Sequence, residues 1–223
     1  MPFPLTHLCV ANRILKMKPL SNPGLFLLGA IAPDAVHHRA EFKGAGMGNI
    51  GPTKKITHLC PVSNERWGQV TDNDGWLVCI REFLQNNPPN ELVLGYATHV
   101  LTDRRNNIGI WHNFRTNHPE EAAKGYTSDF YTDLRNIDIR IAKEFFVGKE
   151  IEKLLADAIP QEIHGLIYEG ELRTMQQSLL DRYIPEELEQ ADTSNCKFVT
   201  YEETLQFIED AAIFCVQILE EFI

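Results

Sequence analysis

Apolar residues recur along this chain at intervals of three and four, the spacing of one face of an α-helix. The pattern predicts a helix that begins at His7 with Thr6 as its N-cap, and a buried helix over GLFLLGAIA that breaks at Pro33. The small residues of this second segment, Gly29, Ala30 and Ala32, should let another helix approach closely. Further helices are expected over residues 72–85, 91–104, 128–146 and 200–222, and two or three more after residue 149. Because no strand alternation or internal repeat occurs, we expect one all-α domain spanning 1–223, with roughly seven to nine helices.

The stretch EFKGAGMGNIGPTKK, residues 41–55, interrupts this periodicity. Gly46 and Gly51 have the spacing of a phosphate-binding loop, but Pro52 and Thr53 follow where Lys and Ser or Thr are required, and no buried strand precedes them. We therefore exclude that motif. Residues 43–55 are instead expected to form a mobile surface loop that acts as a flap over a site.

Composition narrows the classes of function. The 223 residues, 43% of them hydrophobic, can bury one substantial core. Lys and Arg number 21 against 31 for Asp and Glu, and the net charge of -10 disfavours a stable nucleic-acid partner. Neither a signal peptide nor an apolar run of about 18 to 20 residues is found, so a cytoplasmic protein without a transmembrane segment is expected. The five cysteines are scattered, which indicates reduced, mostly buried thiols.

The sequence GYATHVLTD places His99 and Asp103 four residues apart in an apolar segment. On a helix this spacing puts the imidazole and the carboxylate on one face, about one turn apart, where they can hold a single cation. A buried histidine that is hydrogen-bonded to a carboxylate one turn away explains the pair equally well.

Three other candidates stand at the ends of predicted core segments: His7, Asp34 and His58. Each has an ordinary reading when taken alone, as a surface histidine, a helix cap or a satisfied core histidine. Together with His99 and Asp103 they offer three imidazoles and two carboxylates, a set that suits zinc better than calcium or magnesium. The neighbouring His37 and His38 are expected to be exposed or to support the ligands, and Asp129 and Asp133 to lie on a solvated face.

The order of these residues resembles the bacterial zinc-dependent phospholipase C family. The resemblance rests on P-x-T-H, FLLGAIAPDAVHHR, T-H-L and GYATHVLTD, and covers residues 1 to about 111. It implies an all-α fold in which His7, Asp34, His58, His99 and Asp103 line a zinc cleft. Secreted members begin with a metal-binding tryptophan and complete a third metal position through an H-x3-E pair. We expect this chain to lack both features and therefore to bind one or two zinc ions, with His112 and His118 as the available substitutes.

The expected activity is metal-assisted hydrolysis of a phosphate ester, with Asp34 or Asp103 orienting the attacking water as catalytic residues. A small-molecule or lipid phosphodiester is the expected substrate, and the acidic composition favours a soluble one over an anionic bilayer. Two alternatives remain open. One is a non-enzymatic helical protein with a structural zinc or an empty polar cleft, and the other is a related zinc nuclease.

Overall fold

The computed structural model describes residues 3–39, 52–61, 70–190 and 192–222. Every regular element in these ranges is helical, which confirms the all-α class, and the extended pairing found there is one isolated bridge, between Ile163 and Ile167. The α-helices are α1 (Pro4–Met17), α2 (Pro23–Gly29), α3 (Pro52–Thr57), α4 (Asn73–Asn86), α5 (Glu91–Ile108), α6 (Ile110–Asn117), α7 (Pro119–Ala123), α8 (Asp129–Ile141), α9 (Glu150–Asp157), α10 (Glu169–Leu180), α11 (Pro185–Glu189) and α12 (Tyr201–Leu219). Shorter 3-10 or π-helical turns are η1 (Ala32–His38), η3 (Gly125–Thr127) and η4 (Ala142–Phe146).

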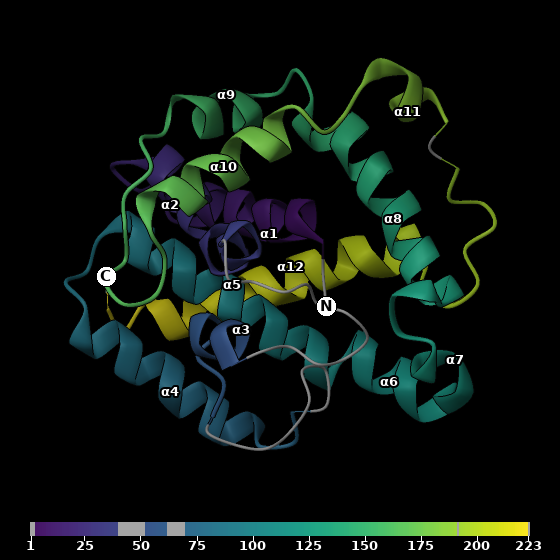
Figure 1. The fold of residues 1–223 in the computed structure, drawn as a ribbon, viewed down its shortest axis with the longest axis horizontal. Coiled ribbons are helices and arrows are strands. Elements are labelled where there is room, and N and C mark those ends of the chain that lie inside the picture. Colours follow the sequence, from purple (N-terminus) through teal and green to yellow (C-terminus); the bar gives the residue numbers. More distant parts are fainter. Residues whose placement is uncertain (1–2, 40–51, 62–69, 191, 223) are drawn as a thin grey trace.

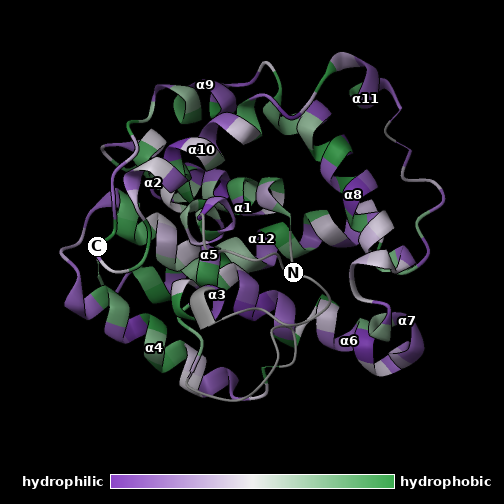
Figure 2. Ribbon diagram, in the orientation of Figure 1, coloured by the Kyte–Doolittle hydropathy of each residue, from purple (hydrophilic) through white to green (hydrophobic). Residues whose placement is uncertain are grey.

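Helix α5 lies at the centre, and the other long helices surround it (Figure 1). Asn90 caps its start, because the Asn90 side chain accepts a hydrogen bond from the Val93 amide. Helix α2 packs closely on α5, α4 and α12 also contact it, and α1 packs on both α5 and α12. The peripheral helices α7 and α11 are largely hydrophilic, as their colouring shows (Figure 2).

Two glycines bring α2 and α5 into backbone contact. A Cβ atom on Gly29 would lie 2.3 Å from the Leu92 carbonyl oxygen, and one on Gly95 would lie 2.1 Å from the Phe26 carbonyl oxygen. Neither position therefore accepts a side chain without moving a helix. The prediction that small residues in the second apolar segment allow a close helix approach is confirmed, and this approach places the chain after α2 beside the middle of α5.

Several predicted boundaries are wrong. Helix α1 begins at Pro4, three residues before His7, and no side chain caps it. Proline suits this position because it lacks the amide hydrogen that a first-turn residue leaves unpaired. Thr6 is consequently a buried residue inside the helix. Helix α5 does not leave the core after Asp103. It continues to Ile108, and Asn107 is buried and donates hydrogen bonds to Val70 and Asn73.

The last part of the predicted flap is also wrong, because Pro52 begins helix α3. Lys54 within that helix is 4% exposed, so it belongs to the core and not to a surface loop. The remainder of the predicted flap, residues 43–51, lies outside the described residues.

The second half confirms most predicted helices. The predicted helix over residues 128–146 is found as α8 and η4, with Ser128 as its N-cap, and four helices follow residue 149. The Asp129 side chain is 49% exposed. Asp133, however, is buried and accepts hydrogen bonds from the amides of Lys197 and Phe198, so the prediction that Asp133 lies on a solvated face is wrong. Twelve α-helices are described, more than expected, because helices of five or six residues show no periodicity.

All five cysteines are free thiols, although Cys215 alone among them is fully buried. None of the described helices combines the length and the apolar character needed to span a bilayer.

Candidate metal centre

His99 and Asp103 project from the middle of α5, and each is 1% exposed. The Nδ1 atom of His99 lies 2.8 Å from the Ala30 carbonyl oxygen. Since a carbonyl only accepts hydrogen bonds, Nδ1 carries the proton and Nε2 keeps its lone pair. That Nε2 atom lies 3.6 Å from Asp103 Oδ2, so the i, i+4 pair is formed as the sequence predicts.

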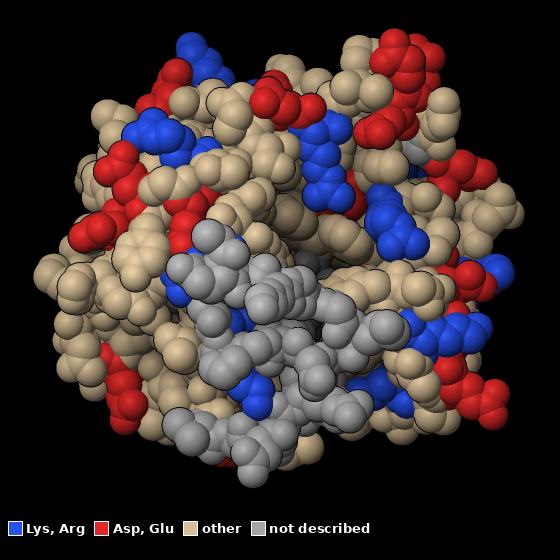
Figure 3. Space-filling view, in the orientation of Figure 1, with Lys and Arg blue, Asp and Glu red and all other residues tan. Residues whose placement is uncertain are grey.

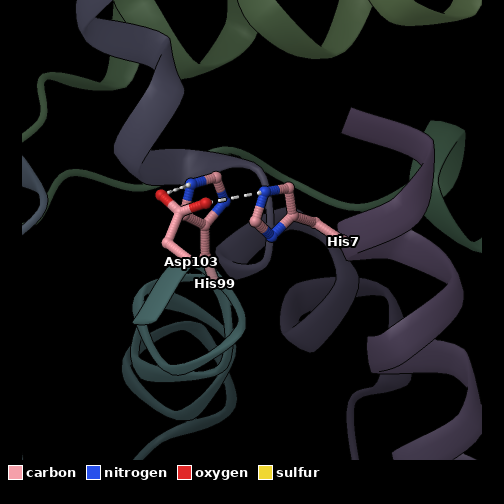
Figure 4. A group of neighbouring side chains, drawn as sticks. All are labelled: His7, His99 and Asp103. Carbon is pink, nitrogen blue, oxygen red and sulfur yellow. Dashed lines mark ion pairs between the residues drawn. The ribbon is translucent and has the colours of Figure 1, made fainter. Parts of the chain in front are cut away.

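His7 comes from the second turn of α1 and is 1% exposed. Its ring stacks on the His99 ring with centroids 3.7 Å apart and planes 6° apart, and its Nε2 atom lies 3.4 Å from Asp103 Oδ1. Figure 4 shows both imidazoles beside the same carboxylate. His7 is therefore an interior residue, and its ordinary reading as a surface histidine is wrong.

Asp34 lies in η1, which follows the close contact of α2 with α5. Its Oδ2 atom is 4.0 Å from His99 Nε2, and its Oδ1 atom is 3.3 Å from His58 Nε2. Arg39 at the end of η1 forms a paired contact with Glu171 of α10, at 2.6 and 2.9 Å, which anchors this turn. The carboxylate therefore points into the interior, as a ligand would, and it does not cap the turn, which is the other reading that the sequence allows.

His58 follows α3 and is fully buried. Its Nδ1 atom lies 3.0 Å from the Lys54 carbonyl oxygen, which directs Nε2 toward Asp34 and, at 3.6 Å, toward Asp103 Oδ2. The main chain beneath it is held by two donors from the core, the Tyr96 hydroxyl to the Thr57 carbonyl and the Trp76 indole to the His58 carbonyl.

The five residues form two groups that could hold a metal ion, and both contain His99. One group is His7, His99 and Asp103, the other is Asp34, His58 and His99, and the ligand atoms within each lie within 4.8 Å of one another. Among the described residues, His99 Nε2 and Asp103 Oδ1 are buried atoms with no hydrogen-bond partner. An unpaired buried acceptor is costly, and a bound cation removes that cost. Imidazole nitrogens combined with carboxylate oxygens fit zinc.

The protonation states also suit metal binding. Burial lowers the pKa of His7 to about 3 and that of His99 to about 4, so both rings are neutral near pH 7. Burial raises the pKa of Asp103 to about 6, which shows how poorly this carboxylate is solvated without a cation. Burial would also raise the pKa of Asp34, but the Lys54 ammonium and the His58 hydrogen bond outweigh burial. They hold the pKa of Asp34 well below its usual range.

Lys54 is a member of the site that the sequence did not reveal. Its Nζ atom lies 2.7 Å from Asp34 Oδ1 and 3.1 Å from His37 Nε2. Burial alone would lower the pKa of this lysine, but Asp34 raises it, so the side chain is an ammonium. One signal was available: Pro52 is a helix-starting residue, and a helix from Pro52 places Lys54 and His58 on the same face.

A cavity of about 280 Å³ opens onto these groups. Asp34 and Asp103 contribute to its wall, together with Lys54, Tyr126 and Arg182. Figure 3 shows a hollow near the middle of this face of the molecule, with basic side chains along part of its edge. The cavity therefore adjoins both carboxylates.

The other histidines lie apart from the two groups. His112 and His118 are exposed on and after α6, and neither belongs to either group. His37 and His38 are exposed and line the cavity, in agreement with the sequence. The chain does contain an H-x3-E spacing, at His37 and Glu41, and Glu41 lies outside the described residues. The number of ions therefore stays a prediction.

Comparisons of the chain with protein-family models, with curated proteins and with solved structures find no match.

Proposed function

We propose that this protein is a zinc-dependent hydrolase of phosphate esters, with a phosphodiesterase or phospholipase C-like activity. One observation carries the proposal: two groups of imidazoles and carboxylates share His99 and present Asp34 and Asp103 to a cavity of about 280 Å³. Zinc would be held by His7, Asp34, His58, His99 and Asp103, as one or two ions. Bound there, it supplies Lewis acidity that polarises a phosphoryl oxygen and lowers the pKa of water.

The protein's own groups have separate tasks in this proposal. Asp34 and Asp103 line the cavity, so their carboxylates can accept hydrogen bonds from a water molecule and orient it for attack. Lys54 places a positive charge at the same wall, where it can stabilise negative charge on a phosphoryl group. His7, His58 and His99 lie behind this wall and are 0 to 1% exposed, which keeps bulk water from their ligand atoms.

The proposed substrate is a small-molecule phosphodiester or the head group of a lipid. A cavity of about 280 Å³ accommodates a compact group better than a polymer, and the net charge of -10 disfavours a nucleic acid. A zinc nuclease therefore remains the less favoured form of the same chemistry.

The Lys54 contact supports a second candidate, a helical protein with a metal-free polar cleft. An ammonium 2.7 Å from Asp34 Oδ1 already supplies a cation to that carboxylate. In this case the cleft is a buried ionic network without hydrolytic function. Asp103 argues for the first candidate, because among the described residues its Oδ1 atom has no hydrogen-bond partner.

The proposal is tested by measuring hydrolysis of bis(p-nitrophenyl) phosphate with and without added zinc. Degradation of single-stranded DNA is measured under the same conditions for comparison. We expect zinc-dependent release of nitrophenol, and a loss of about a hundredfold or more in Asp103→Asn, because even residues behind the ligands commonly contribute ten- to hundredfold. The control is His112→Ala, an exposed histidine away from the site. Zinc-dependent DNA degradation without ester hydrolysis would favour the nuclease, and inactivity on both substrates would favour the metal-free cleft.

A further inference from the structure

The cavity wall carries basic side chains as well as the two carboxylates of the proposed metal centre. Lys54, Arg182, His37 and His38 all line it. Arg182 follows the end of α10, is exposed, and forms no ion pair within the part of the chain that the structure describes, although its charge lowers the pKa of the buried Asp138. Its guanidinium carbon lies 5.6 Å from the centre of the Tyr183 ring. The guanidinium is thus available to a ligand in the cavity.

The charges of the wall balance only when no metal is present. Asp34 and Asp103 supply two negative charges, and Lys54 and Arg182 supply two positive charges. Every divalent ion bound by the carboxylates and imidazoles would therefore leave two positive charges facing the cavity. One negative charge on a phosphodiester does not neutralise them, whereas a ligand with two or more negative charges does.

We propose that the cavity selects a phosphoester that carries a second anionic group, such as a carboxylate or a further phosphate, and that Arg182 binds this group. The inference rests on the proposed function and specifies its substrate class. A guanidinium offers planar paired donors to a carboxylate or phosphate, which gives Arg182 a geometric as well as an electrostatic role. It is a specificity residue, separate from the groups that hold metal.

The rival ligand is a phosphoester with a cationic head group. Tyr126 and Tyr131 also line the cavity, with ring centroids 4.6 Å apart, and aromatic faces can bind quaternary ammonium groups. The observations favour the anion, because Lys54 and Arg182 would repel a cation in the same space and both lining carboxylates are assigned to metal.

Calorimetric titration with three small ligands, none of which is a phosphodiester, tests the inference on zinc-reconstituted protein. The ligands are methylphosphonate, 2-carboxyethylphosphonate, which adds a carboxylate, and phosphorylcholine, which adds a cation. We expect 2-carboxyethylphosphonate to bind about tenfold more tightly than phosphorylcholine, the size of effect typical of one charge-assisted hydrogen-bonded contact. In Arg182→Gln this preference should fall to about threefold or less, while methylphosphonate affinity and zinc content stay unchanged.

The matched control is Arg173→Gln, an exposed arginine of α10 that pairs with Glu169 and does not line the cavity. Equal or tighter binding of phosphorylcholine, an equal loss for all three ligands in Arg182→Gln, or no binding of any ligand would overturn the inference. Ligand preference without hydrolysis of any phosphoester would refute the proposed function and leave the anionic site standing. Hydrolysis of a phosphoester without this ligand preference would refute the anionic site and leave the proposed function standing.

Discussion

The Lys54 ammonium and the proposed zinc ion compete for the Asp34 carboxylate. Replacing Lys54 by methionine should distinguish the effects of the two cations. The substitution keeps a long apolar side chain and removes the ammonium that lies 2.7 Å from Asp34 Oδ1. Both partners are shielded, with side-chain exposures of 5% and 14%. Loss of one partner of a buried pair leaves the other charge uncompensated and costs about 3–5 kcal/mol. The metal-free variant should be less stable than the parent by that amount.

Zinc should reverse this loss. An ion held by Asp34 would be close to the lysine ammonium, because both would contact the same carboxylate. Two unit charges at 4 Å repel by about 1 kcal/mol even in bulk water, and a divalent ion doubles this, so the variant should bind zinc at least about tenfold more tightly. Tight binding to the folded state then restores stability by mass action.

Urea denaturation followed by circular dichroism, with EDTA or with zinc, measures the stability, and competition with a chromophoric chelator measures the affinity. The control is Lys124→Met, which removes an exposed lysine paired with Glu121 and should change neither quantity. A Lys54→Met protein that folds only with zinc is the limiting case of the expected result. Unchanged stability in EDTA, or zinc affinity no higher than that of the parent, would refute the reasoning.

Three further predictions concern the helix contact, the first ligand and pH. Gly95→Ala should destabilise the protein by about 1–3 kcal/mol in thermal or urea unfolding, because its Cβ would lie 2.1 Å from the Phe26 carbonyl oxygen. The control is Gly170→Ala, where the added Cβ meets open space. Equal stability of the two variants would contradict the close contact. His7→Ala should release one ion if two are bound, or weaken binding if one is bound, and unchanged zinc content and affinity would remove His7 from the site. The metal-free protein should lose stability as pH falls from about 6.5 to 4. Burial lowers the pKa of four histidines, His7 to about 3, His37 and His99 to about 4 and His58 well below its usual value, so the unfolded chain binds the extra protons. Asp103 and Asp138, with pKa values raised to about 6, act in the opposite sense but are fewer, and constant stability across this range would contradict the assignment.

The sequence predicted the centre of the fold well. Helix α5 has a polar cap at Asn90 and an apolar body long enough for its helical spacing to be recognised. The small residues of the α2 segment predict that another helix packs closely against it. Apolar spacing does not predict the starts of α1 and α3, because each helix begins at a proline, Pro4 or Pro52, that the pattern alone assigns to a loop. A proline interrupts a helix in its interior but favours one at its start.

The candidate site followed from combining positions that are ordinary when taken singly. His7, Asp34, His58, His99 and Asp103 lie together because α1, η1 and α3 all meet α5 or its neighbours. Lys54 and Arg182 could not be found in this way. Their role depends on which carboxylate or cavity each faces, and Lys54 meets an aspartate that lies 20 positions away in the sequence.

Zinc content after reconstitution tests the central claim most directly. The protein is stripped with EDTA, incubated with excess zinc, passed through a desalting column and measured by elemental analysis. The parent should retain about one or two ions per chain, and His99→Ala, which removes the residue shared by both groups, should retain almost none. His112→Ala should match the parent. A folded parent that retains no zinc, or a His99→Ala protein that retains as much as the parent, would contradict the metal centre.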